Sequence, residues 1–219
     1  MNFKEFQGKI AATSTTLVAV SKTHSPEIIK QIYDQDQRDF GENKVQELVS
    51  KSEVLPGDIR WHMIGHLQTN KVKYITPFVH LIHSLDRISL AREINKQAIK
   101  SDRIIPTLLQ LKVASEESKY GLDPHQIEDF MDEYNRMNFQ NIRISGVMGM
   151  ATFTDEMDLI RTEFEQIERL FEKVKDNYFK EDSEFTIRSY GMSSDYEIAI
   201  RTGSNMVRVG SLIFGDRNY

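Results

Sequence analysis

The sequence repeats one pattern eight times, and this pattern constrains the fold more than any other feature. A short apolar run comes first, and a segment with apolar residues at helical spacing follows it. The first run, Leu17–Val20, has no polar interruption, which is typical of a strand buried on both faces. The runs are not linked by the Asn-Gly or Asp-Gly turns of β-hairpins. We therefore expect parallel strands joined by crossover helices.

Each apolar run predicts one strand. The strands are expected at Leu17–Val20, at Phe40, at Ile59–Ile64, at Val79–Ile82, after Pro106 within Arg103–Val113, at Ile142–Met150, in the weak run Glu184–Gly191 and at Asn205–Val209. Helix starts are marked by capping residues, as where Asp123 precedes Gln126 by three positions. Further helices are expected near Gln68 and after Ser194, which we predict as a cap.

The length of the chain favours one of the two architectures that such a pattern allows. A barrel of eight strand-helix units needs about 200 to 250 residues, and the chain has 219. An open doubly wound sheet is the alternative, but its fingerprint G-x-G-x-x-G is absent. No linker or low-complexity tract marks a domain boundary. We predict an α/β protein with a single-domain (β/α)8 TIM barrel over residues 1–219.

Charge and composition exclude several functional classes. The net charge is −5 and the pI about 5.7, so a nucleic-acid or anionic-membrane partner is not expected. The absence of cysteine excludes disulfides, thiolate metal sites and a cysteine nucleophile. Neither a membrane span nor a signal peptide is recognisable, which predicts a cytoplasmic protein.

A lysine lies where a parallel barrel carries its chemistry. Lys22 follows the first predicted strand by two residues, and the carboxyl ends of all eight strands meet at one mouth. Two interpretations are open at this point. Lys22 is either an ordinary loop lysine or a partly buried amine that forms a Schiff base with an aldehyde.

The turns after strands seven and eight have the small residues of an anion site. Ser189, Ser193 and Ser194 precede a predicted helix, and Gly210 and Ser211 follow the last strand. Backbone N–H groups and hydroxyls in such turns bind phosphate in many barrels. The alternative is that these residues only cap helices.

Arg208 shares a strand face with Gly210 and is predicted to point into the barrel. Because a guanidinium only donates hydrogen bonds, it needs an acceptor there. A pyridine nitrogen is one candidate and would stay unprotonated, which supports only mild carbanion chemistry. An ion pair inside the barrel, for instance with Glu42, is the other candidate.

The histidines do not predict a metal site. His62 and His66 are four residues apart but lack the glutamate of H-E-x-x-H, and His80 and His83 have no evident third ligand. His62 is expected among the polar groups that line the mouth, together with Asn43, Gln68 and Asn70, unless these only make loop hydrogen bonds.

Six segments in order across nearly the whole chain resemble a known family. They read VSKTH, FGENKVQE, WHMIGHLQTNK, GVMGM, GMSSDYEIAI and GSNMVRVGSLIFG. The set resembles the pyridoxal phosphate homeostasis proteins, which share the barrel of the alanine racemase N-terminal domain.

The resemblance implies a cofactor and the residues that hold it. It implies pyridoxal 5'-phosphate bound as a Schiff base on Lys22, with phosphate contacts from Ser189, Ser193, Gly210 and Ser211.

The remaining binding positions also follow from the resemblance. Arg208 matches the arginine that faces the pyridine nitrogen, and Asn43 and His62 match pocket positions. Met148, from GVMGM, and Met192, from GMSSDYEIAI, complete the predicted cofactor-binding set.

Two residues depart from the family pattern beside the phosphate turn. Where the family commonly reads LSMGMS, Arg188 and Tyr190 flank Ser189. The serine hydroxyls are kept. The exchange of two apolar residues for Arg188 and Tyr190 means that the family pattern does not predict the packing behind Ser189.

The family resemblance implies a carrier of the cofactor that acts in vitamin B6 and amino-acid homeostasis. Expected partners are the cofactor and apoenzymes that use it, and the chain is expected to be a monomer or weak homodimer. An amino-acid racemase is the alternative, but racemases bring a tyrosine base on a second domain. We expect no room for that domain before Tyr219, and Lys22 is the one evident base. A phosphosugar-binding barrel is a third candidate.

Overall fold

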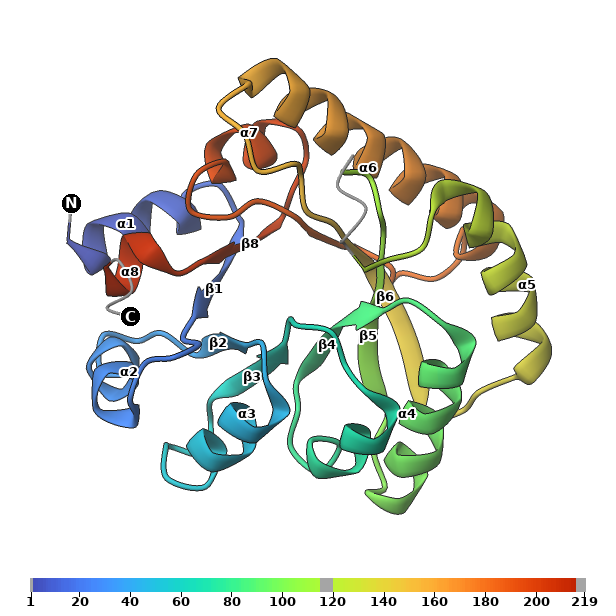
Figure 1. The fold of residues 1–219 in the computed structure, drawn as a ribbon, viewed down its shortest axis with the longest axis horizontal. Helices are drawn as coiled ribbons and strands as arrows, with labels where there is room; N and C mark the ends of the chain where they lie inside the picture. Colours follow the sequence, from blue (N-terminus) through green and yellow to red (C-terminus); the bar gives the residue numbers. More distant parts are fainter. Residues whose placement is uncertain (1, 115–119, 216–219) are drawn as a thin grey trace.

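The computed structural model describes residues 2–114 and 120–215, and they form a closed parallel barrel with helices around it (Figure 1). The strands are β1 (Thr16–Val20), β2 (Asp39–Glu42), β3 (Arg60–Met63), β4 (Leu81–Leu85), β5 (Ile105–Gln110), β6 (Ile142–Met148), β7 (Ile187–Ser189) and β8 (Met206–Val209). They follow the order of the sequence, and β8 pairs in parallel with β1 to close the ring. The predicted (β/α)8 barrel is thus confirmed.

Helices connect the strands and cover the outside of the barrel. They are α1 (Phe3–Ala11), α2 (Pro26–Tyr33), α3 (Val45–Ser52), α4 (Ile88–Lys100), α5 (Ile127–Met137), α6 (Met157–Tyr178), α7 (Tyr196–Arg201) and α8 (Ser211–Phe214), with short 3-10 helices η1 (Thr69–Tyr74) and η2 (Pro124–Gln126). α1 was not predicted, because it precedes the first apolar run. It lies beside α8 (Figure 1), and Phe6, Ile10 and Ile213 belong to one apolar cluster.

The main core lies between the strands and the helices. The apolar stripe of α6 buries Phe164 and Phe171 completely, which contributes roughly 2 to 3 kcal/mol for each side chain. A second, smaller cluster fills part of the barrel interior and consists of Val18, Leu81, Leu108, Met148 and Met206. The interior also holds buried polar side chains, which are described with the site.

Two local predictions need correction, at Pro106 and at the cap before α7, whereas the short helix expected near Gln68 is present. β5 includes Pro106, which pairs with Arg143 near the start of the strand, where a missing N–H is tolerated. The helix expected near Gln68 is the 3-10 helix η1. The cap before α7 is Asp195 rather than Ser194, and its Oδ1 accepts a hydrogen bond from the Met192 N–H.

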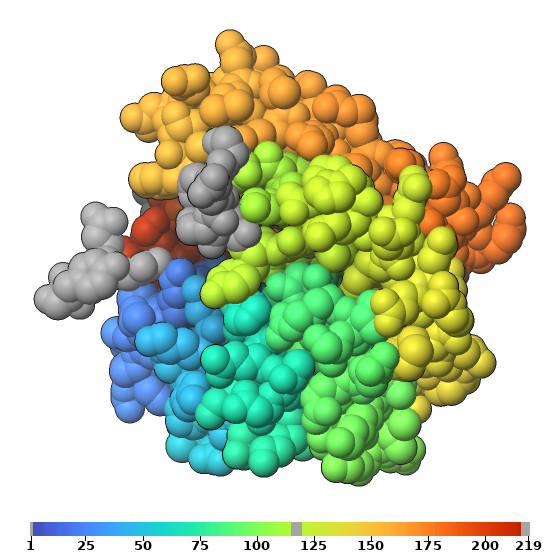
Figure 2. Space-filling model, turned by 45° about the vertical axis from the view of Figure 1, so that its right-hand side comes forward, coloured from blue at the N-terminus to red at the C-terminus, as the bar shows by residue number. Residues whose placement is uncertain are grey.

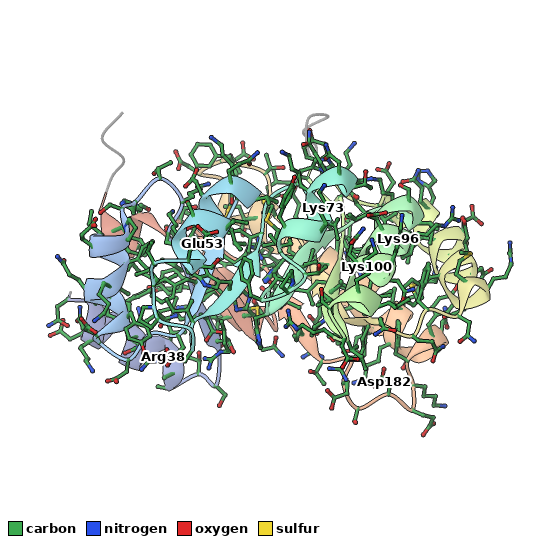
Figure 3. All side chains as sticks on the ribbon, turned by 90° about the horizontal axis from the view of Figure 1, so that it is seen from below. Arg38, Glu53, Lys73, Lys96, Lys100 and Asp182 are labelled. Carbon is green, nitrogen blue, oxygen red and sulfur yellow. The ribbon has the colours of Figure 1, made fainter. Side chains whose placement is uncertain are left out.

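The outer surface is helical and charged. Orange α6 covers the top of the face in Figure 2, and green α4 lies below it. Exposed lysines such as Lys73, Lys96 and Lys100 belong to η1 and α4 (Figure 3). Within residues 2–114 and 120–215, no helix combines the length and the apolar character needed to cross a membrane.

Candidate functional site

A cavity of about 710 Å3 opens at the carboxyl ends of the strands. Most of the residues predicted to bind a cofactor line this cavity. They are Lys22, Asn43, Met192, Ser193, Arg208, Gly210 and Ser211. The structure therefore brings together one amine, several hydroxyls, one guanidinium and one carboxamide from strands β1, β2, β7 and β8.

The loop that carries Lys22 is fixed by a buried ion pair behind it. Lys51 Nζ donates to Glu42 Oε1 over 2.8 Å and to the carbonyl of Ser21 over 2.9 Å. The Ser21 hydroxyl donates to the same Glu42 oxygen over 2.5 Å. Glu42 and Lys51 are almost fully buried. Because two of these hydrogen bonds involve Ser21, the residue before Lys22, the backbone that carries the amine is held by the fold.

The residue after Lys22 is held in an uncommon conformation. Thr23 has a φ of 69°, a left-handed value that costs energy for a β-branched residue. Its N–H donates to Glu47 Oε2 over 2.8 Å. Glu47 in turn lies 3.2 Å from Lys51 Nζ. α3 therefore supplies the groups that hold both neighbours of Lys22.

The same contacts decide one of the alternatives for Arg208. Glu42 was one candidate for an ion pair with this arginine, and it bonds to Lys51 and Ser21 instead. Burial raises the pKa of Glu42, although the hydrogen bond from Lys51 opposes that effect. An ion pair between Arg208 and Glu42 is therefore not found.

The guanidinium of Arg208 is held by oxygen atoms of the barrel. Nη1 donates to both the carbonyl and the hydroxyl of Ser189, each over 2.7 Å, and Nη2 donates to the Gly149 carbonyl over 2.9 Å. Burial lowers the pKa of Arg208 to about 10, so the group remains a cation near neutral pH. Arg208 therefore presents a fixed positive charge to the cavity.

The turns after β7 and β8 form one side of the cavity. The Gly210 N–H donates to Ser193 Oγ over 3.2 Å, which joins the two turns. Gly191 needs to be glycine, because its φ is 100° and a Cβ there would lie 2.5 Å from the Ala199 Cβ. The helices that follow have six and four residues, so N–H groups and hydroxyls are the main donors to an anion here.

Three predicted residues do not line the cavity. His62 and Ser189 are fully buried inside the barrel, and Met148 belongs to the interior apolar cluster. Ser189 ends a strand of three residues, and its hydroxyl bonds to Arg208 and His83. The expected direct phosphate contact of Ser189 is corrected accordingly. The cavity hydroxyls of this turn belong to Ser193 and Ser194.

Sequence reasoning missed several lining residues on other strand ends. His24, His66, Gln110, Tyr120 and Phe153 all line the cavity. His66 stacks on Tyr120 with ring centroids 4.0 Å apart. Because imidazole and phenol groups line the cavity beside Lys22, Lys22 is not its one acid–base group. His66 lies in the loop beyond β3, which ends at Met63, so strand alternation gives no signal for it.

The two departures from the family pattern are accommodated by α6. Tyr190 is fully buried, and its hydroxyl donates to Glu168 over 3.0 Å and to the Thr202 carbonyl over 3.2 Å. Arg188 forms ion pairs with Glu168 and Glu172. Both side chains therefore bind to the helical layer, and neither competes for the cavity.

One group of side chains has the spacing of metal ligands. Ligand atoms of Asp39, His62 and His80 lie within 4.8 Å of one another. However, both Asp39 oxygens accept hydrogen bonds from Arg60, over 2.8 and 2.5 Å, and His62 bonds to one of them. Because Arg60 already neutralises the carboxylate, these contacts do not favour a cation, and the absence of a metal stays a prediction.

Comparison with known proteins is consistent with this geometry. The family described as "Alanine racemase, N-terminal domain" matches residues 1–218. The pyridoxal phosphate homeostasis protein of Aquifex aeolicus is 38% identical over 204 residues, which are 93% of this chain and 87% of the relative. The chain belongs to the pyridoxal phosphate homeostasis protein family. The predicted family is thus confirmed.

Other members of the homeostasis protein family agree over similar lengths. The homeostasis protein of Schizosaccharomyces pombe is 33% identical over 219 residues, which are 97% of this chain and 89% of the relative. The structure of PipY from Synechococcus elongatus with pyridoxal phosphate bound has a TM-score of 0.85 and 30% identity, and it covers 97% of this chain and 99% of PipY. Alanine racemase of Clostridium difficile shares only the fold, with a TM-score of 0.74 and 13% identity over 99% of this chain and 56% of the racemase.

Proposed function

We propose that this protein binds pyridoxal 5'-phosphate as a Schiff base on Lys22 and acts in vitamin B6 and amino-acid homeostasis. The observation that carries the proposal is the shared cavity, where Lys22, the turns after β7 and β8, and Arg208 all face one space. Membership of the family and the cofactor bound to PipY support it.

The residues present fit the groups of this cofactor. Ser193, Ser194 and Ser211 offer hydroxyls for a phosphate. Gly210 leaves the backbone open here, because a Cβ on this residue would lie 3.3 Å from the Val20 carbonyl oxygen. Arg208 offers a donor to a ring nitrogen and keeps that nitrogen unprotonated. When bound, the cofactor supplies an aldehyde for reaction with an amine.

Lys22 supplies that amine. Its Nζ adds to the aldehyde carbon, and loss of one water molecule leaves a carbon–nitrogen double bond. The hydrogen bonds from Lys51, Glu42 and Glu47 hold the backbone on both sides of Lys22, so the side chain starts from a fixed position at the cavity. While Lys22 is attached, the cofactor has no free aldehyde, and it leaves when water or another amine displaces the Lys22 amine from that carbon.

The biological role follows from holding and releasing the cofactor. We propose that the protein buffers pyridoxal phosphate in the cytoplasm and transfers it to apoenzymes, as a monomer or a weak homodimer. The negative net charge supports a role without nucleic acid or anionic membranes.

The test is an absorbance spectrum of the loaded protein before and after borohydride reduction. We expect a visible band that disappears on reduction and an adduct that survives denaturation. Lys22→Ala should form no such adduct, with Lys44→Ala, which changes another lysine, as the control. Equal amounts of trapped adduct in Lys22→Ala and in the wild type would contradict the proposal. A colourless protein that still binds inorganic phosphate would favour the phosphosugar-binding barrel.

One observation favours racemase activity as a second candidate. His66 and Tyr120 stack at the cavity, and His66 Nδ1 lies 3.7 Å from Asp86 Oδ2. These groups can move a proton in addition to Lys22. Incubation of the loaded protein with L-amino acids, followed by chiral analysis, tests this candidate. Stereoinversion at ordinary enzyme rates that is lost in Tyr120→Phe would support it.

A further inference from the structure

A chain of hydrogen bonds crosses the interior of the barrel from Arg208 to Asp39. Arg208 Nη1 lies 2.7 Å from Ser189 Oγ, and that oxygen lies 3.1 Å from His83 Nδ1. His83 Nε2 lies 2.9 Å from His62 Nδ1, and His62 Nε2 lies 3.0 Å from Asp39 Oδ1. The five residues come from β8, β7, β4, β3 and β2. The chain therefore connects the cavity to side chains that lie deep between the strands.

The two end groups of this hydrogen-bond chain, Arg208 and Asp39, fix the direction of every hydrogen bond between them. A guanidinium can only donate, so Ser189 Oγ accepts from Arg208. A carboxylate can only accept, so His62 donates from Nε2 to Asp39. With both imidazoles neutral, His83 must donate from Nε2 to His62, and Ser189 must donate its hydroxyl proton to His83 Nδ1. We therefore assign the Nε2–H tautomer to both histidines.

The opposite direction carries a high cost. It would need His62 to hold protons on both ring nitrogens inside the barrel, and His83 to donate from Nδ1 to Ser189. Both imidazoles are fully buried, and Arg208 already brings one buried cation. Burial, together with the nearby Arg208 cation, holds the pKa of His83 well below 6.5. His83 is therefore neutral in either direction, and only the assigned direction also leaves the buried His62 neutral.

The far end of the chain is anchored by a second arginine. Arg60 donates to both oxygens of Asp39, over 2.8 and 2.5 Å. Burial alone would raise the pKa of Asp39, but the bonds from Arg60 and His62 outweigh it and hold that pKa well below its ordinary value. Asp39 therefore stays ionised and remains an acceptor for His62.

We propose that Ser189 and His83 are positioning residues that hold the guanidinium of Arg208 for the ring nitrogen of the cofactor, through a one-way hydrogen-bond chain anchored at Asp39. This inference rests on the proposed function. Within the described residues, the guanidinium is held by the Ser189 and Gly149 carbonyls and by the Ser189 hydroxyl. Of these three acceptors, the Ser189 hydroxyl is the one that belongs to the hydrogen-bond chain. Polarisation along the linked hydrogen bonds strengthens its bond with Arg208.

Four variants separate positioning from a merely structural role. Ser189→Ala removes the hydroxyl, and His83→Leu removes the imidazole. His83→Asn keeps an acceptor near the place of Nδ1 and is the conservative rescue. Ser84→Ala is the matched control, because Ser84 is an equally buried serine on β4 whose Oγ has no hydrogen-bond partner within the described chain.

The measurements are the dissociation constant for pyridoxal phosphate, the wavelength of the visible band and the borohydride-trapped adduct. We expect Ser189→Ala and His83→Leu to keep the adduct, to weaken binding about tenfold or more and to shift the band. His83→Asn should stay within about threefold of the wild type, and Ser84→Ala should match it. Unchanged affinity and band position in Ser189→Ala would overturn the proposal, even if His83→Leu fails to fold. A wild-type protein without any trapped adduct would instead refute the proposed function.

A second measurement tests the direction of the chain without the cofactor. Two-bond 15N–1H correlation spectra of the cofactor-free protein at pH 7 distinguish the imidazole tautomers. We expect protonated Nε2 and unprotonated Nδ1 for both His62 and His83. A doubly protonated His62, or a proton on His83 Nδ1, would overturn the assigned direction.

Discussion

The Gly210 N–H donates a hydrogen bond to Ser193 Oγ over 3.2 Å, and this contact joins the turns after β7 and β8. The two turns therefore act as one surface toward the cavity. Ser193 lies in the turn after β7, and its hydrogen-bond partner Gly210 lies in the turn after β8. Removal of the Ser193 hydroxyl therefore disturbs both turns.

The first prediction concerns this shared surface. Ser193→Ala removes a hydroxyl that faces the cavity and leaves the Gly210 N–H without its partner. Hydrogen bonds to charged groups contribute about 1.5 to 3 kcal/mol, so we expect the dissociation constant for pyridoxal phosphate to rise roughly ten- to hundredfold. Equilibrium titration followed by absorbance measures it. Ser50→Ala, which changes an exposed serine of α3, should leave the constant unchanged, and equal affinities in the two variants would contradict the prediction.

The second prediction concerns the close approach of two loops at the cavity. A Cβ on Gly65 would lie 2.3 Å from the Asn43 carbonyl oxygen, whereas a Cβ on Gly57 would meet no atom within 4 Å. We expect Gly65→Ala to lower the free energy of unfolding by about 1 to 3 kcal/mol. Gly57→Ala is the control and should change it by less than about 0.5 kcal/mol. Urea denaturation followed by circular dichroism measures both, and a Gly65→Ala variant as stable as Gly57→Ala would be inconsistent with the described packing.

The third prediction concerns the ion pair behind Lys22. Lys51→Ala leaves Glu42 buried without its cation, which costs about 3 to 5 kcal/mol of stability in buried pairs. The exposed pair of Lys30 and Asp34 on α2 is the control, and Lys30→Ala should cost less than about 0.5 kcal/mol. The same Lys51→Ala variant should trap less adduct with borohydride, because the carbonyl of Ser21 loses its hydrogen bond from Lys51 and keeps only the one from the His24 N–H. Similar unfolding midpoints for the two variants would show that the buried pair contributes little.

The fourth prediction is a pH dependence of stability. Burial, together with the nearby Arg208 cation, holds the pKa of His83 well below 6.5 in the folded protein. Below pH 6.5 the unfolded chain binds this proton and the folded chain does not, so the free energy of unfolding falls as the pH falls. The slope for one such histidine approaches about 1.4 kcal/mol per pH unit.

The histidine responsible can be identified by substitution. His83→Asn should flatten the dependence between pH 6.5 and 5, and His125→Asn, which changes an exposed histidine, serves as the control. Burial also lowers the pKa of His80 to about 4, so His80 contributes in the same direction. An unchanged slope in His83→Asn would mean that His83 does not carry the dependence.

The architecture could be predicted because burial on both faces makes the strands visible in the sequence. β1 contains the uninterrupted apolar run Leu17–Val20, and the stripe of α6 has clear helical spacing. α1 was missed although the sequence carries a helix-start signal there, because Asn2 and Glu5 have the spacing of a capping box. Pro106 was placed outside its strand, since the sequence does not show that the proline occupies the second position of β5.

The site was predictable where residues follow a strand end, and unpredictable where contacts join distant strands. Lys22 and Gly210 were placed correctly by the rule that chemistry lies beyond carboxyl ends. Ser189 was misplaced because one residue in the short strand β7 decides whether a hydroxyl points into the barrel or into the cavity. The contact between His62 and His83 links residues 21 positions apart, and no local sequence pattern predicts it.

The fifth prediction tests the central claim, the attachment of the cofactor to Lys22. The measurement is peptide mapping by mass spectrometry after pyridoxal phosphate loading and borohydride reduction of the wild-type chain. The account predicts a single reduced adduct, on the peptide that contains Lys22. An adduct located mainly on any other lysine, or a loaded protein whose Lys22 peptide stays unmodified, would contradict it.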